Sequence, residues 1–250
     1  MALDTASSVL PAIEAAAGLA LGLNAELAGL FIEDERLLRS AELPFAREFG
    51  FASARARDLA PASLEQALRA QAEQLRRLLA ATAERLSIAW TLEVVRGEVP
   101  RSVLARAETS DLLVLGRSEY TWPGAHRRMD PAQRFPALAT RPLAVVFDGS
   151  AKALRALSIG STLADVTASE LTVLIPASAT ETYNDLRERA AGHLAGRSGA
   201  SYLYLPDNSS GSIIRTARIH HFGVLLWPGC IEQLKPAQLT ELPCPVVVFN

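Results

Sequence analysis

The sequence has little cysteine, no long apolar run and no excess of one charge, and each absence excludes a class of protein. Only Cys230 and Cys244 occur in 250 residues, too few for a four-cysteine zinc site or the disulfide framework of a small secreted domain. The net charge is −2, so no basic surface for nucleic acid is indicated. The most apolar window, 15–32, contains Asn24 and Glu26, and the first residues lack the basic start of a signal peptide. We expect a cytoplasmic protein that binds neither nucleic acid nor membrane.

The chain has enough apolar material for a large core. Hydrophobic side chains make up 49% of its residues, and a chain of this length buries roughly 70–75% of its unfolded surface. Its 14 prolines and 15 glycines are too few for a collagen-like or low-complexity protein. We therefore predict a globular protein of one or two domains.

The sequence contains an internal repeat. Residues 3–32 align without gaps on residues 147–176 at an offset of 144, with eight identities in thirty positions. The repeat predicts two domains, at 1–141 and 142–250. The identical pairs are Asp4 with Asp148, Leu10 with Leu154, Ala12 with Ala156, Leu19 with Leu163, Ala20 with Ala164, Glu26 with Glu170, Leu27 with Leu171 and Leu30 with Leu174.

Both copies have the pattern of a strand, a helix and a second strand. In the second copy, the apolar run 142–147 ends at a small turn, 148–150, which is typical of a strand that leads into a helix. Apolar residues at helical spacing and a second apolar run, 170–175, follow. The first copy has the same order, with its opening strand shortened to residues 1–4. Such units form parallel sheets with right-handed crossovers.

The remaining elements also come in a similar order in both copies. Leucines at helical spacing between Leu64 and Leu86 predict a long helix, with Ser63 and Gln66 as its capping box. We count about nine strands in all, and residues 142–147 either close the first domain or open the second. The other predicted elements are a strand at 88–97, a helix at 100–108 and a strand at 111–115 in the first copy, and a strand at 202–205, a helix at 212–219 and strands at 222–227 and 245–249 in the second.

Residues 33–58 have no counterpart in the second copy. The segment carries both acidic and arginine residues, with Phe45, Phe49 and Phe51 among them. This composition favours a helix and loop that cover the edge of a sheet. A lid over a ligand, or a surface on which a partner docks through the three phenylalanines, is the alternative.

The order of these motifs resembles the universal stress protein family. The resemblance is carried by the Asp turn after the opening strand, by residues 26–34 (ELAGLFIED), by Val-Arg-Gly97 and by residues 111–116 (DLLVLG), in an arrangement that occurs twice. Residues 30–34 and 43–48 are similar to a bacterial tandem subgroup. The resemblance covers nearly all of the chain. It implies an α/β fold with two Rossmann-like doubly wound parallel sheets, of the adenine nucleotide alpha hydrolase kind, packed as a pseudo-dimer.

The first copy departs from the loop with which members of this family hold ATP. That loop has Gly, two residues, Gly, nine residues, then Gly followed by Ser or Thr, because bare peptide amides can approach phosphates closely. Gly116 fits the first position, but Glu119, Met129 and Asp130 stand at the later ones. A carboxylate such as Glu119 at about 4 Å from a phosphate is repelled by roughly 4 kcal/mol.

The second copy departs from the loop as well, so we expect neither copy to bind ATP in the way of the family. The residues at the loop positions are Trp227, Pro228, Cys230, Thr240 and Glu241, or, counted from Gly229, Glu232, Leu242 and Pro243.

The remaining candidate contacts for a nucleotide or another anion lie at the two Asp turns and after the strand 111–115. Asp4 and Asp148 stand where the family has its adenosine-facing Asp, and each is equally suited to the N-terminus of a helix. Arginines clamp phosphates well, so Arg127 and Arg128 would assist in a nucleotide-binding alternative. The candidates are Asp148, Gly149, Ser150, Asp4, Gly116 and Arg117.

The sequence contains no motif that indicates a catalytic or a metal site. There is no Gly-x-Ser-x-Gly elbow and no Walker loop, and His126, His193, His220 and His221 lack ligand spacing. A serine-rich segment, 209–212, is explained by capping of a helix.

The leading hypothesis is a non-enzymatic stress-response protein without a required cofactor, which acts through unknown protein partners or an unidentified small ligand. One alternative binds ATP or AMP and hydrolyses it weakly at most. Another is a pure interaction module. A homodimer is a further option that the sequence leaves open.

Overall fold

The protein alternates apolar strands with helices along most of its length. The computed structural model describes residues 6–49, 56–58, 60–108, 110–116, 135, 138, 141–195, 199–229 and 244–249. The α/β fold class expected from the sequence is confirmed, because most strands pair in parallel and helices separate them along the chain. None of the described helices is long and apolar enough to cross a membrane.

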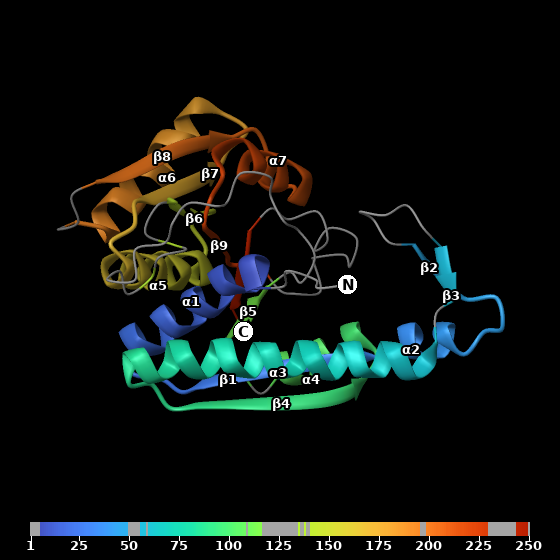
Figure 1. Ribbon diagram of the computed structural model, residues 1–250. Helices are drawn as coiled ribbons and strands as arrows, with labels where there is room; N and C mark the ends of the chain where they lie inside the picture. Colours follow the sequence, from blue (N-terminus) through green and yellow to red (C-terminus); the bar gives the residue numbers. More distant parts are fainter. Residues whose placement is uncertain are drawn as a thin grey trace.

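The larger of the sheets has six strands in the order β5-β10-β9-β6-β7-β8. In Figure 1 its strands β7 and β8 lie at the top of the molecule, away from β1 and β4 at the bottom. The five strands from the second half of the chain are parallel, and β5 from the first half pairs antiparallel with β10. The segment 142–147, whose place the sequence left open, forms β6 between β9 and β7. The strands are β5 (Leu112–Leu115), β6 (Leu143–Val146), β7 (Leu171–Pro176), β8 (Ala200–Leu205), β9 (Val224–Trp227) and β10 (Val246–Phe249).

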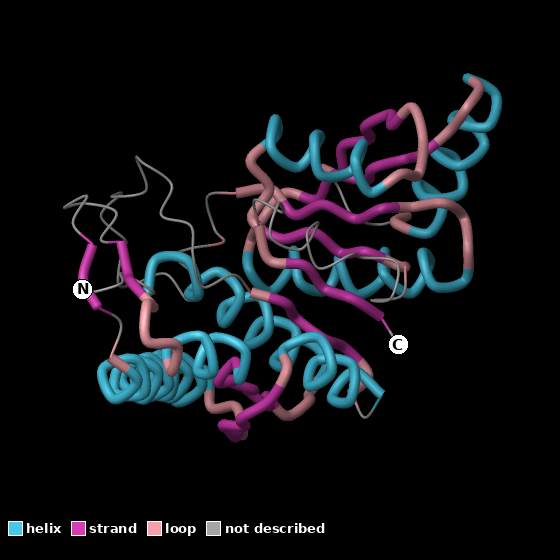
Figure 2. The backbone as a smooth tube through the Cα atoms, turned by 90° about the vertical axis from the view of Figure 1, so that its right-hand side faces the viewer, coloured by secondary structure: helices cyan, strands magenta, loops and turns pink. Residues whose placement is uncertain are grey.

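Helices lie on both sides of this sheet (Figure 2). Leu143 and Val145 of β6 join the core cluster that contains Leu157 of α5, whereas Ala144 joins the cluster that contains Ile213 of α7. Successive residues of a strand point to opposite faces, so a strand covered on both sides is apolar throughout. The helices of this half are α5 (Ala151–Thr167), α6 (Thr180–His193) and α7 (Ser210–His220).

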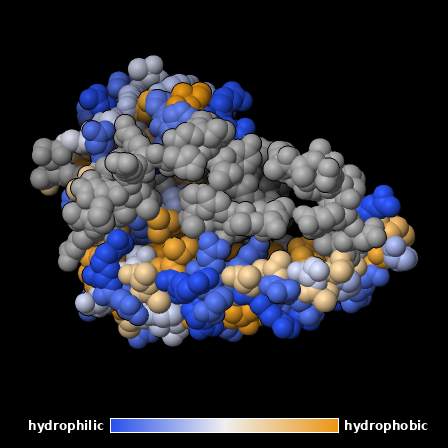
Figure 3. Space-filling model, in the orientation of Figure 1, coloured by the Kyte–Doolittle hydropathy of each residue, from blue (hydrophilic) through white to orange (hydrophobic). Residues whose placement is uncertain are grey.

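The first half contains a second, two-stranded parallel sheet of β1 and β4. The 26-residue helix α3 packs against α1 and against these strands. Its outer surface mixes hydrophilic and hydrophobic residues (Figure 3). The elements are α1 (Ala6–Leu23), β1 (Leu27–Asp34), α2 (Glu35–Ala41), α3 (Pro61–Leu86), β4 (Trp90–Gly97) and α4 (Val99–Glu108).

Helices α1 and α5 pack against each other across the two halves. Gly18 of α1 faces Leu163 of α5, and Gly22 faces Thr162. At the 144-residue offset of the sequence repeat, α1 and α5 begin and end within one residue of each other. The halves are therefore joined by this helix pair and by the β5–β10 ladder.

Segment 33–58 was expected to form a helix and a loop, and the helix is present as α2. In place of the loop the structure has a small antiparallel hairpin, β2 (Arg47–Phe49) and β3 (Ala56–Asp58). Strands of three residues are too short to show alternation, so the pattern does not reveal them. The described residues thus form ten strands rather than about nine, and the strand expected at 1–4 lies outside the described residues.

The predicted capping box of α3 is also wrong. The helix begins at Pro61, after Ala60, and no side chain caps it. Proline suits the first helical position because its backbone has no N–H to leave unsatisfied. Ser63 consequently lies inside the first turn and not before it.

Candidate functional site

The candidate site lies where the chain changes direction in the six-stranded sheet. The crossover from β6 leads to β7 on one side, whereas β9, on its other side, follows β8. Ligands of open α/β sheets bind at the carboxyl ends of the strands at such a switch point. Asp148, Gly149 and Ser150 follow β6 after Phe147, and Pro228 follows β9.

The polar side chains of the Asp148 turn accept hydrogen bonds from nearby backbone N–H groups. Asp148 Oδ1 accepts a hydrogen bond from the Ser150 N–H at 2.9 Å, and Ser150 Oγ accepts one from the Ala153 N–H at 3.1 Å. Gly149 has a φ of +81°, a conformation that residues with a Cβ rarely adopt. These contacts give Asp148 and Ser150 the helix-starting role that the sequence left open for Asp148. Asp148 nevertheless stays exposed.

Side chains of α6 cover the turn, which sequence reasoning missed. Arg189 donates a hydrogen bond from Nη2 to the Gly149 carbonyl oxygen at 2.9 Å. A Cβ at Gly149 would lie 2.7 Å from Leu186 Cδ2 and 2.8 Å from Arg189 Nη1. In the sequence Arg189 is one of several charged residues of an exposed helix, so only the tertiary structure distinguishes it.

The carboxyl end of β9 has few groups that could donate a hydrogen bond to a phosphate. Trp227 and Pro228 are buried, and Pro228 has no N–H to donate. Gly229 is half-buried. The later positions of the loop in the second copy, from Cys230 to Pro243, lie outside the described residues.

Of the candidates in the first half, only Gly116 can be placed. It directly follows β5, and a Cβ there would lie 2.6 Å from the Cβ of Ala12 in α1. The absence of a side chain is thus needed for helix packing, whether or not a ligand binds. Outside the described residues lie Asp4, Arg117, Glu119, Arg127, Arg128, Met129 and Asp130.

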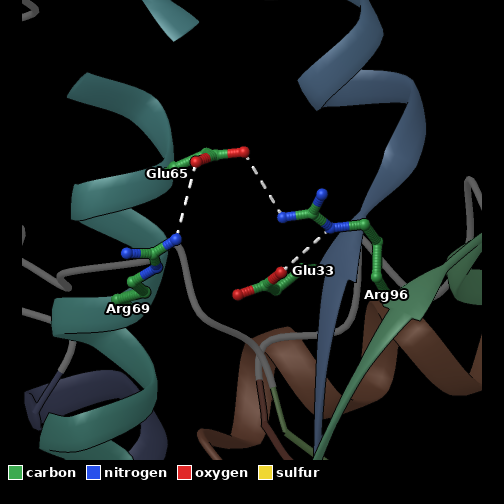
Figure 4. Close-up of polar contacts among 4 residues, drawn as sticks. All are labelled: Glu33, Glu65, Arg69 and Arg96. Carbon is green, nitrogen blue, oxygen red and sulfur yellow. Dashed lines mark hydrogen bonds and ion pairs between the residues drawn. The ribbon is translucent and has the colours of Figure 1, made fainter. Parts of the chain in front are cut away.

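A cluster of four charged residues lies at the carboxyl ends of β1 and β4 (Figure 4). Arg96 Nε donates to Glu33 Oε2 at 3.2 Å and Arg96 Nη2 approaches Glu65 Oε1 at 3.5 Å, while Arg69 pairs with the other oxygen of Glu65 at 3.6 Å. Two arginines and two glutamates balance their charges. The cluster ties α3 to the two-stranded sheet and presents no surplus charge to an ion.

The other polar candidates have local roles. Ser209 Oγ accepts a hydrogen bond from the Ser212 N–H at 3.2 Å, as expected of a cap. His193 Nε2 lies 2.6 Å from Ser158 Oγ, and the ring of His220 stacks on Phe222. Among the described residues, no three His, Cys, Asp or Glu side chains are grouped to hold a metal ion. His126 lies outside the described residues.

Of the three phenylalanines of the proposed docking surface, only Phe45 has a described side chain. Phe45 has 76% of its surface exposed. Phe49 belongs to β2, without a described side chain, and Phe51 lies outside the described residues. Docking through this segment stays a prediction.

The chain is similar to known proteins in its fold rather than in its sequence. No protein-family model matches the chain, and no curated protein matches its sequence. A universal stress protein from Archaeoglobus fulgidus DSM 4304 matches with a TM-score of 0.52 and 13% identity, over 96% of this chain and 93% of that chain. The chain has the universal stress protein fold.

Shorter universal stress protein structures each match less than half of the chain. A universal stress protein in complex with cAMP has a TM-score of 0.35 and 16% identity, over 44% of this chain and 96% of that chain. A member of the universal stress protein family from Burkholderia pseudomallei has a TM-score of 0.34 and 15% identity, over 44% and 96% of the two chains.

Proposed function

We propose that the chain is a duplicated universal stress protein-like protein that acts through contacts with other proteins, or with an unidentified small ligand, rather than through catalysis. Its two copies are residues 1–141 and 142–250, packed as a pseudo-dimer. The matching bounds of α1 and α5 and the β5–β10 ladder support this division. The fold and the sequence resemblance support a role in the response to stress.

The proposal that ATP binding is lost rests on the hydrogen bonds that already occupy the Asp148 turn. The Asp148 carboxylate accepts from the Ser150 N–H, and Arg189 is engaged with the Gly149 carbonyl. A nucleotide would have to displace Leu186 and Arg189 from the turn or bind beside them. Pro228 adds no donor on the other side of the switch point.

A second candidate function is binding of an adenine nucleotide, which one observation favours. Asp148 and the guanidinium of Arg189 meet at one turn, at the switch point where α/β folds bind ligands. An arginine released from the Gly149 carbonyl is a good phosphate ligand.

Calorimetric titration of the full chain with ATP and with AMP tests the two candidates. We expect no binding at micromolar nucleotide. Micromolar binding that Asp148→Asn or Arg189→Ala abolishes, and that the matched Asp185→Asn variant on the exposed face of α6 retains, would establish the second candidate. Binding that all variants retain would contradict both, because the nucleotide would then lie away from this turn.

A further inference from the structure

Strand β8 is the end strand of the six-stranded sheet, at the side away from β5. Among the described residues it pairs with β7 alone, and its Ser201 and Tyr204 are exposed. Helix α6 packs mainly against β7 rather than over β8. In the sequence repeat the strand expected at residues 1–4 is the counterpart of β6, an inner strand, so the repeat provides no strand for this edge. An end strand presents backbone N–H and C=O groups to which another strand can add.

The backbone groups of two tyrosines face the outer edge of β8. The Leu205 carbonyl oxygen accepts a hydrogen bond at 3.1 Å from the N–H of Ala177, which directly follows β7, so the backbone of Leu205 faces β7. Backbone groups of successive residues in a strand point to opposite sides. Those of Leu203 therefore also face β7, whereas those of Tyr202 and Tyr204 face outward and can bond a further strand.

No charged side chain of β8 opposes the addition of a strand. The end strand of the two-stranded sheet, β4, carries Glu93 and Arg96, which pair with Arg106 and Glu33. Charged side chains and proline on an edge strand discourage pairing with another chain. The sequence of β8, ASYLYL, contains neither. The edge of β8 is therefore better suited to pairing than that of β4.

Aromatic side chains line the face of β8 that is turned toward α6. Tyr204 packs edge-on against Tyr183 of α6, with 5.8 Å between the ring centroids. The guanidinium of Arg187, one helical turn further along α6, lies 5.6 Å from the centroid of the Tyr202 ring. Tyrosine and arginine are enriched at the centres of protein interfaces. These contacts also hold the two rings in place, which lowers the entropy that a partner must remove.

The order of residues in β8 favours a second copy of this chain as the partner. Residues 202–204 read the same in both directions, Tyr-Leu-Tyr. When two such strands pair antiparallel about a twofold axis at Leu203, Tyr202 of each copy lies opposite the partner's Tyr204. Each of these opposed pairs exchanges both of its N–H···O hydrogen bonds, and the aromatic side chains lie beside each other across the strands.

The other end of the same sheet shows that an antiparallel strand fits beside a sheet covered by these helices. There β10 is the last strand from the second half, and β5 from the first half pairs antiparallel with it. We propose that β8 pairs antiparallel with β8 of a second copy, about a twofold axis at Leu203, and so joins the six-stranded sheets of two molecules. A twofold contact of this kind closes on itself, so the assembly ends at a dimer. The dimer does not depend on whether a nucleotide binds at Asp148.

Sedimentation equilibrium of the full chain over a series of concentrations tests the proposal, and we expect a monomer–dimer equilibrium. Leu203→Lys brings two like charges together at the twofold axis, so we expect it to raise the dissociation constant of the dimer at least about tenfold. Leu203→Glu is expected to do the same. An equimolar mixture of the two variants is expected to restore a dimer with one molecule of each, because opposite charges then face each other.

Val94→Lys is the matched control, since Val94 is an exposed residue of β4, the end strand of the other sheet. We expect this variant to dimerise as the unmodified protein does. Circular dichroism checks that the variants fold. Hydrogen exchange of the unmodified protein, followed by NMR above and below the dissociation constant, locates the contact if a variant does not fold. We expect the dimer to slow exchange at the amides of Tyr202 and Tyr204 and to leave that of Leu203 unchanged.

Several outcomes would overturn the proposal. One is a monomer throughout the concentration series. Others are a dimer that neither Leu203 variant weakens, a dimer that slows exchange away from β8, and a mixture of the two folded variants that stays monomeric, which would exclude the register at Leu203. A positive nucleotide titration would contradict the proposed loss of ATP binding and leave the sedimentation result unchanged.

Discussion

Gly116 and Ala12 meet where β5 passes beside α1, and a Cβ on Gly116 would lie 2.6 Å from the Cβ of Ala12. Real Cβ atoms do not approach so closely, so the glycine permits the contact between this strand and helix. The family resemblance places the first glycine of the nucleotide loop at Gly116. The packing explains this glycine without any ligand, and its presence alone therefore does not indicate a nucleotide site.

The Gly116→Ala variant is expected to be destabilised, because an added methyl group forces α1 away from β5. Overpacking of this kind costs about 1–3 kcal/mol of the free energy of unfolding. Urea denaturation followed by circular dichroism measures it. The matched Gly192→Ala variant on α6, where an added Cβ would meet nothing within 4 Å, is expected to be neutral or slightly stabilised. Equal stability of the two variants would contradict this account of Gly116.

Arg96→Met is expected to loosen the tie between α3 and the β1–β4 sheet. Arg96 holds Glu33 and Glu65, but about half of its side chain is exposed, so we expect a loss of at most about 1 kcal/mol in the free energy of unfolding. The loss should shrink in about 1 M salt, which screens exposed charges. Denaturation at low and high salt measures it.

Arg76→Met is the control for Arg96, since Arg76 pairs only locally, with Glu73 of the same helix, among the ion pairs of the described residues. We expect a smaller effect for this variant. A loss at Arg76 as large as that at Arg96 would show that the four-residue cluster does not hold the elements together.

The buried thiol of Cys244 is expected to lower the stability of the protein at alkaline pH. Burial raises the pKa of its thiol from an ordinary value of 9.0 to about 12. Between these values the thiol of the unfolded chain ionises while that of the folded chain stays protonated, so the free energy of unfolding falls as pH rises from 9 to about 12. Below pH 9 this contribution is constant.

Denaturation of the protein and of Cys244→Ala across this range measures the effect of the thiol. Burial also raises the pKa of Tyr202, against a smaller opposing effect of Arg187, and the comparison removes this shared contribution. We expect a shallower decline with pH in Cys244→Ala. Parallel declines in the two proteins would rule out the thiol as a cause.

Local pattern predicted most of the elements. The buried strands β6, β7 and β9 were visible as short apolar runs, and α5 and α1 as apolar residues at helical spacing, because burial on one or two faces imposes a period on the sequence. The hairpin of β2 and β3 was missed because its strands are too short for a period. The capping box of α3 failed because Pro61 starts the helix earlier.

The candidate site was less predictable than the elements. Asp148 and its turn were found because they directly follow an apolar run. The partner of that turn, Arg189, lies about forty residues further along the chain on an exposed helix, where arginine is ordinary. Its role depends on the packing of α6 over the turn, which no local signal records.

The sequence by itself determined the α/β class, since apolar strands and amphipathic helices depend on residue type and on spacing along one segment. The duplication and the departures from a phosphate-binding loop stay predictions. Only the tertiary structure decided that β5 pairs with β10 and that Arg189 covers the Asp148 turn. Each of these relations joins residues far apart in the chain. Their geometry is set by the packing of whole helices and strands, and a pattern of neighbouring residues does not contain it.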